Sequence, residues 1–161
     1  MTTKTIESAE IKNFKECAGN EGSAFSCSLY IDGKRVAEVR NDGNGGGNFY
    51  DFDPKHRDLE DPFIDYLNTM PSVVEHLEEN PPEDDEPKWM RRVNADIGFE
   101  DLLEEFELKK LERKVVLFRV PGQKYREGEW STVHHRGQKE PAREAMRKKY
   151  GNGVVFATTG E

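Results

Sequence analysis

The sequence predicts an α+β fold in which helices pack mainly on one face of an antiparallel β-sheet. Three observations lead to this prediction. Apolar and polar residues alternate over residues 24–40, apolar residues recur at helical spacing over residues 58–70 and 97–111, and strand-like segments return after residue 113. The chain has 161 residues, about the length of one domain, so we expect a single domain over residues 1–161.

The first strands are predicted from the alternation and from turn residues. Residues 24–40 are expected to form a hairpin, because Asp32-Gly33 is a preferred pair for a tight turn between strands. A cluster of turn residues at 19–23 precedes this hairpin. We therefore expect residues 11–18 to form a third strand, antiparallel to it.

The next segment, residues 41–48, contains four glycines and three asparagines in eight residues. This composition excludes a regular helix or strand and leaves backbone N–H groups exposed. Such groups can cradle a phosphate, but the Gly-Lys-Ser/Thr ending of a P-loop is missing and no helix follows. The alternative is a flexible or bulged connection. The residues that would bind a small molecule or nucleotide here are Asn41, Asp42, Gly43, Gly45, Gly46, Gly47, Asn48 and Tyr50.

Helices are expected in the middle of the chain. Apolar spacing predicts a helix over residues 58–70, which Pro71 ends. Ser72 is expected to cap a second, short helix that ends at Leu77, and residues 97–111 form a longer amphipathic helix.

The last third returns to strands. Residues 115–120 and 130–134 are predicted to pair as a hairpin. A short helix over residues 141–150 and a final strand over residues 154–157 follow.

The charge is unevenly distributed. Residues 51–108 carry 5 basic and 19 acidic side chains, whereas residues 109–150 carry 13 basic and 5 acidic ones. Residues 78–87 alone hold six acidic residues and three prolines, which predicts a mobile, solvated loop at about residues 78–88. Such asymmetry points to electrostatic attraction of a partner, although the two blocks would also neutralise each other within one fold.

Cysteine and histidine give no catalytic or metal-binding pattern. A turn centred on Gly22 would place Cys17 opposite Cys27, and we expect core packing rather than a disulfide. His134 and His135 are adjacent, so on a strand their rings point to opposite faces and share no metal ion. The Gly-x-Ser-x-Gly motif is also missing. We therefore expect no catalytic residue, no metal and no cofactor.

Membrane insertion is not expected. The sequence has no run of about 18 apolar residues, and residues 1–10 lack the apolar stretch of a secretory signal. These features favour an intracellular protein.

One resemblance rests on residues 24–46. The Asp32-Gly33-Lys34 turn and the run Asn41-Asp42-Gly43-Asn44-Gly45-Gly46 resemble a pattern in small uncharacterised proteins of bacteriophages and mobile elements. The resemblance implies an accessory protein in the cytoplasm of a bacterial host. It implies no catalytic residues.

The predicted function is therefore that of a non-enzymatic interaction protein that binds and modulates a host protein with a basic surface, such as a defence or nucleic-acid-processing factor. The residues expected to contact it are Glu78, Glu79, Glu83, Asp84, Asp85 and Glu86. A ligand at residues 41–48 and an enzyme that uses His134 or His135 are the alternatives. Nucleic-acid binding is disfavoured for the acidic block and stays open for the basic C-terminal segment.

Overall fold

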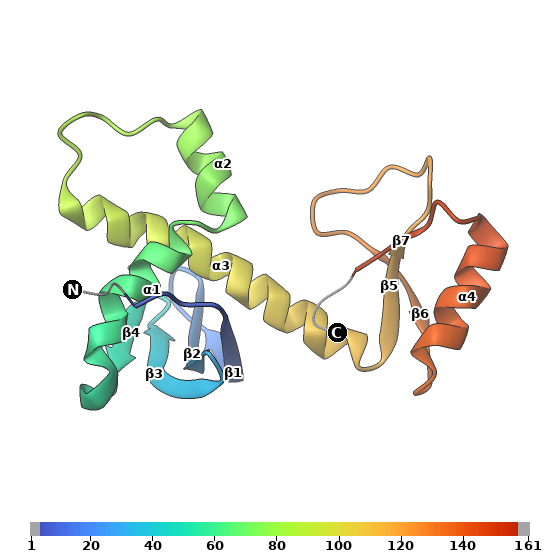
Figure 1. Cartoon of the computed structure of the whole chain (residues 1–161), viewed down its shortest axis with the longest axis horizontal. Helices are drawn as coiled ribbons and strands as arrows, with labels where there is room; N and C mark the ends of the chain where they lie inside the picture. Colours follow the sequence, from blue (N-terminus) through green and yellow to red (C-terminus); the bar gives the residue numbers. More distant parts are fainter. Residues whose placement is uncertain (1–3, 158–161) are drawn as a thin grey trace. The chain divides into compact units, whose positions relative to one another are not determined.

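The structure, a computed structural model, describes residues 4–157 and divides the chain into two compact units, Met1–Phe106 and Glu107–Glu161 (Figure 1). The α+β class is confirmed, because both units combine an antiparallel sheet with helices. The strands, which the sequence suggested as one sheet in one domain, form two sheets with separate cores.

Unit 1 contains a four-stranded antiparallel sheet in the order β1-β2-β3-β4. Its elements are β1 (Ala9–Ala18), β2 (Ser23–Ile31), β3 (Lys34–Asn41), β4 (Phe49–Phe52), the 3-10 helix η1 (Pro54–Leu59), α1 (Glu60–Leu67), α2 (Pro71–Glu79) and α3 (Lys88–Glu112), which continues past the unit boundary. The predicted hairpin is present, and both Asp32 and Gly33 have positive φ, as a tight hairpin turn requires. The third strand is also confirmed as β1, antiparallel to β2.

The register of β1 on β2 differs from the expected one. Cys17 lies opposite Ala24 rather than Cys27, because the chain turns at residues 19–22, where the N–H of Gly19 donates to the carbonyl of Gly22 (2.7 Å). Both cysteines are free. Cys27 packs in the core as expected, and burial raises the pKa of its thiol to about 12, with Glu38 adding to the effect. Cys17 is exposed, so the core prediction was wrong for it.

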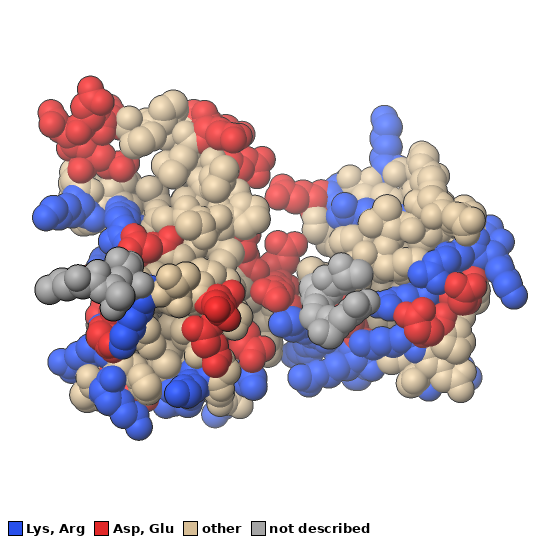
Figure 2. Space-filling model, in the orientation of Figure 1, with Lys and Arg blue, Asp and Glu red and all other residues tan. Residues whose placement is uncertain are grey.

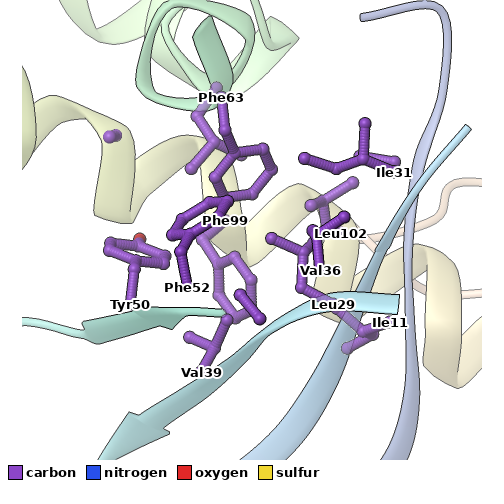
Figure 3. Packing of buried hydrophobic residues seen from close by; sticks show 14 of the residues in the cluster. Ile11, Leu29, Ile31, Val36, Val39, Tyr50, Phe52, Phe63, Phe99 and Leu102 are labelled. Atoms are coloured by element: carbon purple, nitrogen blue, oxygen red, sulfur yellow. The ribbon is translucent and has the colours of Figure 1, made fainter. Parts of the chain in front are cut away.

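The core of unit 1 lies between one face of the sheet and the helices α1 and α3 (Figure 3). Phe99 of α3 is fully buried, and its ring centroid lies 6.0 Å from that of Phe25 and 5.8 Å from that of Tyr50. Phe63 of α1 continues the aromatic series at 5.9 Å from Tyr50 and 6.0 Å from Phe52. Aromatic pairs at these distances stabilise the core by more than the burial of their apolar surface alone.

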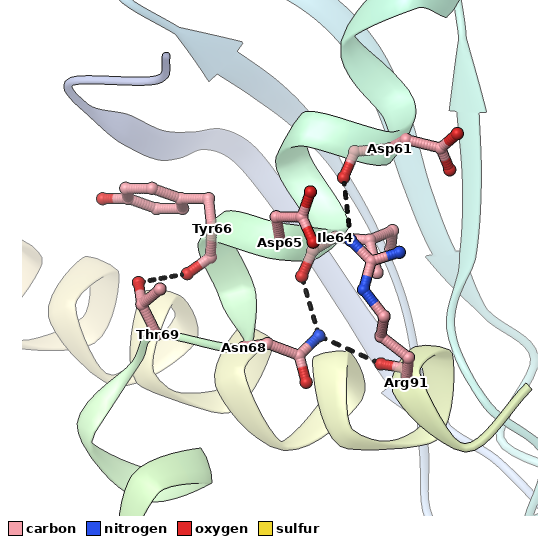
Figure 4. A network of polar contacts seen from close by, with 7 residues as sticks. All are labelled: Asp61, Ile64, Asp65, Tyr66, Asn68, Thr69 and Arg91. Atoms are coloured by element: carbon pink, nitrogen blue, oxygen red, sulfur yellow. Dashed lines mark hydrogen bonds and ion pairs between the residues drawn. The ribbon is translucent and has the colours of Figure 1, made fainter. Parts of the chain in front are cut away.

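Helices α1 and α3 approach each other closely at Gly98. A Cβ atom at this position would lie 2.1 Å from the carbonyl oxygen of Leu67, so only glycine permits the contact. Polar contacts also join α1 to α3 (Figure 4). The Asn68 side-chain amide donates to the carbonyls of Ile64 (2.8 Å) and Arg91 (3.1 Å), and the Arg91 guanidinium pairs with Asp65.

Helix α2 begins without the predicted serine cap. Its N-cap residue is Met70, and Ser72 lies inside the first turn. The backbone N–H and the hydroxyl of Ser72 both donate to the Asp101 carboxylate of α3, at 3.0 and 2.5 Å. A carboxylate from another helix therefore satisfies one of the orphan backbone donors at this N-terminus and interacts favourably with the helix dipole.

Unit 2 contains a three-stranded sheet in the order β6-β5-β7. Its elements are β5 (Val115–Arg119), β6 (Ser131–His134), α4 (Lys139–Tyr150) and β7 (Val155–Phe156). All four predicted elements are present, with ends shifted by up to two residues. The core is small and centres on Val115, Leu117 and Ala157, with Leu108 and Trp130 packed against it.

Candidate functional surfaces

The acidic segment, residues 78–86, lies at the end of α2 and in the connection to α3. Glu78 and Glu79 belong to the last turn of α2, so the loop begins at Asn80 and not at residue 78 as expected. The helix extends this far because the N–H of Asn80 still donates to the carbonyl of His76 (2.9 Å). All of residues 78–89 are exposed.

The six carboxylates of this segment take no part in any ion pair within residues 4–157. Other acidic residues of unit 1 do, because Glu60 pairs with Arg92 (2.7 Å) and Asp65 pairs with Arg91. Figure 2 shows acidic side chains gathered over α2 and the α2–α3 connection. The segment therefore presents negative charge that the described part of the chain does not neutralise by direct pairing.

Exposed apolar side chains lie directly beside this segment. Trp89 in the first turn of α3 is 60% exposed, and Val93, one turn later, is 46% exposed. Residues four apart lie on the same face of a helix, so these two side chains form one apolar strip. Sequence analysis did not identify them. Their only signal was a tryptophan immediately after an acidic, proline-rich loop.

The glycine-rich segment uses its polar groups internally. The Asn41 side-chain oxygen accepts from the N–H of Gly43 (2.9 Å), and its amide donates to the carbonyl of Gly46 (3.2 Å) and to the Asn48 side-chain oxygen (3.0 Å). The N–H of Asn44 donates to Asp42 (3.1 Å). Several of the amides that an anion would need are therefore already occupied.

The surroundings of the segment also disfavour an anion. The carboxylate of Asp96, from α3, accepts hydrogen bonds from the Tyr50 hydroxyl (2.8 Å) and the N–H of Asn48 (3.3 Å). It lies so close to Gly47 that a Cβ atom there would be 2.6 Å from its oxygen. Burial raises the pKa of Asp96, and the two hydrogen bonds partly offset this shift. A phosphate at this point would meet a carboxylate.

Two residues near the segment have roles other than those expected. Tyr50 is buried in the core and is not accessible to a ligand for stacking, whereas its neighbour Phe49 is 58% exposed. Gly43 has positive φ, and its Cβ would lie 2.8 Å from the Cα of Gly19. This glycine is therefore required by close packing of two turns.

Hollows lie on the face of the sheet that the helices leave uncovered. One of about 420 Å³ is lined by Ser26, Arg40 and Phe49, together with residues of the glycine-rich segment. A second of about 300 Å³ is lined by Lys15, Cys17 and Ser26. Because Ser26 lines both, the hollows adjoin across β2.

Of the adjacent residues His134 and His135, only His135 has a structural role. His134 is exposed, whereas His135 is buried. The Nδ1 atom of His135 accepts from the N–H of Gly137 (2.9 Å), which leaves Nε2 as the donor to the carbonyl of Glu112 (2.8 Å). With both ring nitrogens occupied by the backbone, His135 is not positioned for proton transfer to a substrate.

Part of the basic charge in the C-terminal segment is used within unit 2. In α4, Arg143 pairs with Glu140 and Arg147 with Glu144, both at 2.5 Å. The two guanidinium groups also lie over the ring of Phe156, at 5.9 and 5.1 Å. These arginines pack α4 against β7.

The described residues contain neither a group of three or more metal-ligating side chains nor a helix that is long and apolar enough to cross a bilayer. The chain matches no protein-family model, no curated protein and no solved structure with which it was compared.

Proposed function

We propose that the protein is a non-enzymatic interaction protein that binds a basic surface of another protein through the acidic segment 78–86. The observation that carries the proposal is the combination, in one exposed region, of six unpaired carboxylates with the apolar strip of Trp89 and Val93. Tryptophan is among the residues most enriched at the hot spots of protein–protein interfaces.

Charge and apolar contact have separate roles in this proposal. The carboxylates attract a basic partner over a distance and increase the association rate, an effect that salt screens. Trp89 supplies buried area after docking and accepts a partner Lys or Arg over its ring. The acidic charge repels phosphate groups, which favours a protein partner over nucleic acid at this surface.

The nature of the partner stays a prediction. The bacteriophage or mobile-element origin, the location in a bacterial host and the modulation of a host defence or nucleic-acid-processing factor are expectations from the sequence alone. The proposal needs none of them, because it specifies only a partner with a basic surface and an apolar contact for Trp89.

The test is a pull-down from nuclease-treated bacterial lysate, followed by titration of any purified partner. The wild type is compared with the fourfold variant Glu83→Lys, Asp84→Lys, Asp85→Lys, Glu86→Lys, and with Trp89→Ala. A matched fourfold control changes the net charge by the same amount at other positions of unit 1. Its substitutions are Glu7→Lys, Glu16→Lys, Asp51→Lys and Asp61→Lys. Phe49→Ala is the control for loss of an exposed aromatic ring.

We expect a partner that the wild type and both controls retain and that high salt releases. Charge reversal of the segment and Trp89→Ala are each expected to weaken its Kd by at least about tenfold, as for a hot-spot residue. Equal retention by all variants, or capture by none, would contradict the proposal.

A further inference from the structure

A row of side chains crosses the uncovered face of the four-stranded sheet. Lys15 of β1 lies opposite Ser26 of β2, Ser26 opposite Arg40 of β3, and Arg40 opposite Phe49 of β4. Residues paired in this way in antiparallel strands have side chains on the same face. The face is the one opposite the core, because the neighbours Cys27 and Val39 point inward.

The row runs along both hollows of this face. Lys15 and Ser26 line the smaller one, and Ser26, Arg40 and Phe49 line the larger one of about 420 Å³. A volume of this size is within the range of small-molecule sites. The sheet therefore provides a shallow trough with a cation on each side of a hydroxyl group and an aromatic ring at one end.

The polar groups of the row are available to a ligand. Within residues 4–157, Lys15 forms no ion pair and the Ser26 hydroxyl has no hydrogen-bond partner. Arg40 pairs with Glu38 through Nε at 3.6 Å, but both side chains are about half exposed, so solvent weakens this pair. The terminal nitrogens of Arg40 remain free to donate to an anion.

The aromatic end of the row has an exposed ring. The Arg40 guanidinium carbon lies over the Phe49 ring, 5.3 Å from its centroid, so the cation covers one face of the ring. One strand spacing, about 5 Å, separates these two residues, and about twice that distance separates Lys15 from Arg40. An anion above Ser26 is therefore within reach of both long cationic side chains.

We propose that this trough binds a small ligand that carries a phosphate group and a planar aromatic ring, the chemistry of a nucleoside monophosphate. The phosphate lies over Ser26 between Lys15 and Arg40, and the ring stacks on the face of Phe49 that the Arg40 guanidinium does not cover. The glycine-rich segment contributes the rim of the larger hollow through Asp42 and Gly47 rather than a cradle of amides. Asp42 also lines the larger hollow, so the site takes one anionic group and disfavours polyanions.

The test is titration of the full chain with AMP, followed by NMR of backbone amides and by calorimetry. We expect shifts at Ser26, Arg40 and Phe49, with weaker binding of inorganic phosphate alone and of adenosine alone. Lys15→Gln, Arg40→Gln and Phe49→Ala are each expected to raise the Kd for AMP by about fivefold or more, the effect of one lost contact of about 1 kcal/mol. Lys12→Gln and Arg35→Gln, cations of the same face outside both hollows, are the matched controls.

Three results would overturn the proposal. They are absence of AMP-dependent shifts at 5 millimolar ligand, equal weakening by the control variants, and binding of a single-stranded oligonucleotide without binding of AMP. The fourfold variant of the acidic segment distinguishes this site from the proposed function, because it should bind AMP with unchanged affinity while it loses the protein partner.

Discussion

The two units have the same class of fold but are held together differently. Unit 1 has a continuous series of aromatic rings from Phe14 through Phe25 and Phe99 to Tyr50, with centroids 5.6–6.0 Å apart. Unit 2 has three residues at the centre of its core. It relies more on Arg119, whose guanidinium lies 4.1 Å from the Trp130 ring, and on the hydrogen bonds of His135.

The charges divide in the same way. Unit 1 carries 11 basic and 25 acidic residues, and unit 2 carries 13 basic and 7 acidic ones. A large apolar core allows unit 1 to keep unpaired acidic charge on its surface, because stability comes from burial. In the smaller unit 2, cations over aromatic rings have a structural role. The comparison predicts that unit 1 and unit 2 respond to different substitutions.

The largest expected effect is that of Phe99→Ala. Removing this fully buried ring should lower the free energy of unfolding of unit 1 by about 3–5 kcal/mol, through lost burial and the cavity left behind. Urea titration followed by NMR of amides from each unit measures the change, with Leu117→Ala in the core of unit 2 as the reciprocal variant. If both units lost structure together in both variants, they would form one cooperative domain and the comparison would fail.

Gly98→Ala tests the close approach of α1 and α3. Alanine is normally the better helix former, by about 1 kcal/mol. Here its Cβ meets the Leu67 carbonyl, so we expect a loss of about 1–3 kcal/mol in unit 1, measured by the same urea titration. Gly46→Ala, where a Cβ meets open space, is the control and should change stability by less than about 0.5 kcal/mol. A stabilising Gly98→Ala would show that the helices separate readily.

His135→Ala tests how much the two buried hydrogen bonds of His135 stabilise unit 2. The substitution leaves the carbonyl of Glu112 and the N–H of Gly137 without their present partner, which should cost about 1–2 kcal/mol. Hydrogen exchange of unit 2 amides should increase while that of unit 1 is unchanged. His134→Ala, at an exposed position, is the control. Equal effects of the two variants would mean that the buried hydrogen bonds contribute little.

The smallest effect concerns pH and unit 1. Because burial raises the pKa of Asp96 above the ordinary 3.8, ionisation of this group opposes folding. The contribution of Asp96 to the free energy of unfolding of unit 1 therefore decreases as pH rises from the ordinary pKa through the raised pKa. The same contribution recovers as pH falls again. NMR titration of the Asp96 carboxyl carbon should give a midpoint above 3.8. Tyr50→Phe removes a hydrogen bond to the ionised form and should raise the midpoint further; a midpoint at or below the ordinary value would contradict this.

Sequence reasoning located most elements because their signals are local. The β2–β3 hairpin follows from alternation and from the turn at Asp32-Gly33, and α4 follows from Pro141 near its start and Gly151 just past its end. The first turns of α3 were missed, since the expected helix began at residue 97 and α3 begins at Lys88. The apolar residues of these turns, such as Trp89 and Val93, are exposed rather than part of the core, and the turns are held by contacts such as that of Asn68 with the Arg91 carbonyl.

The candidate surfaces were predictable to a smaller extent. The acidic segment was evident from composition, because a run of carboxylates and prolines cannot be buried. The roles of Phe49 and Tyr50 could not be predicted from composition. Adjacent residues of a strand point to opposite faces, and the register of β4 against β3 decides which of the two faces the core. The row from Lys15 to Phe49 has members separated by up to 34 positions, and only strand pairing brings them together.

The sequence by itself therefore determined the α+β class, the antiparallel hairpins and the separation of acidic from basic charge. These properties depend on spacing, turn residues and composition, which act over short stretches of chain. The tertiary structure decided the division into two units, the register that separates Cys17 from Cys27, and the use of the glycine-rich segment for close packing. Those properties depend on which distant segments bury each other's apolar surface and satisfy each other's backbone groups, and local patterns do not encode that choice.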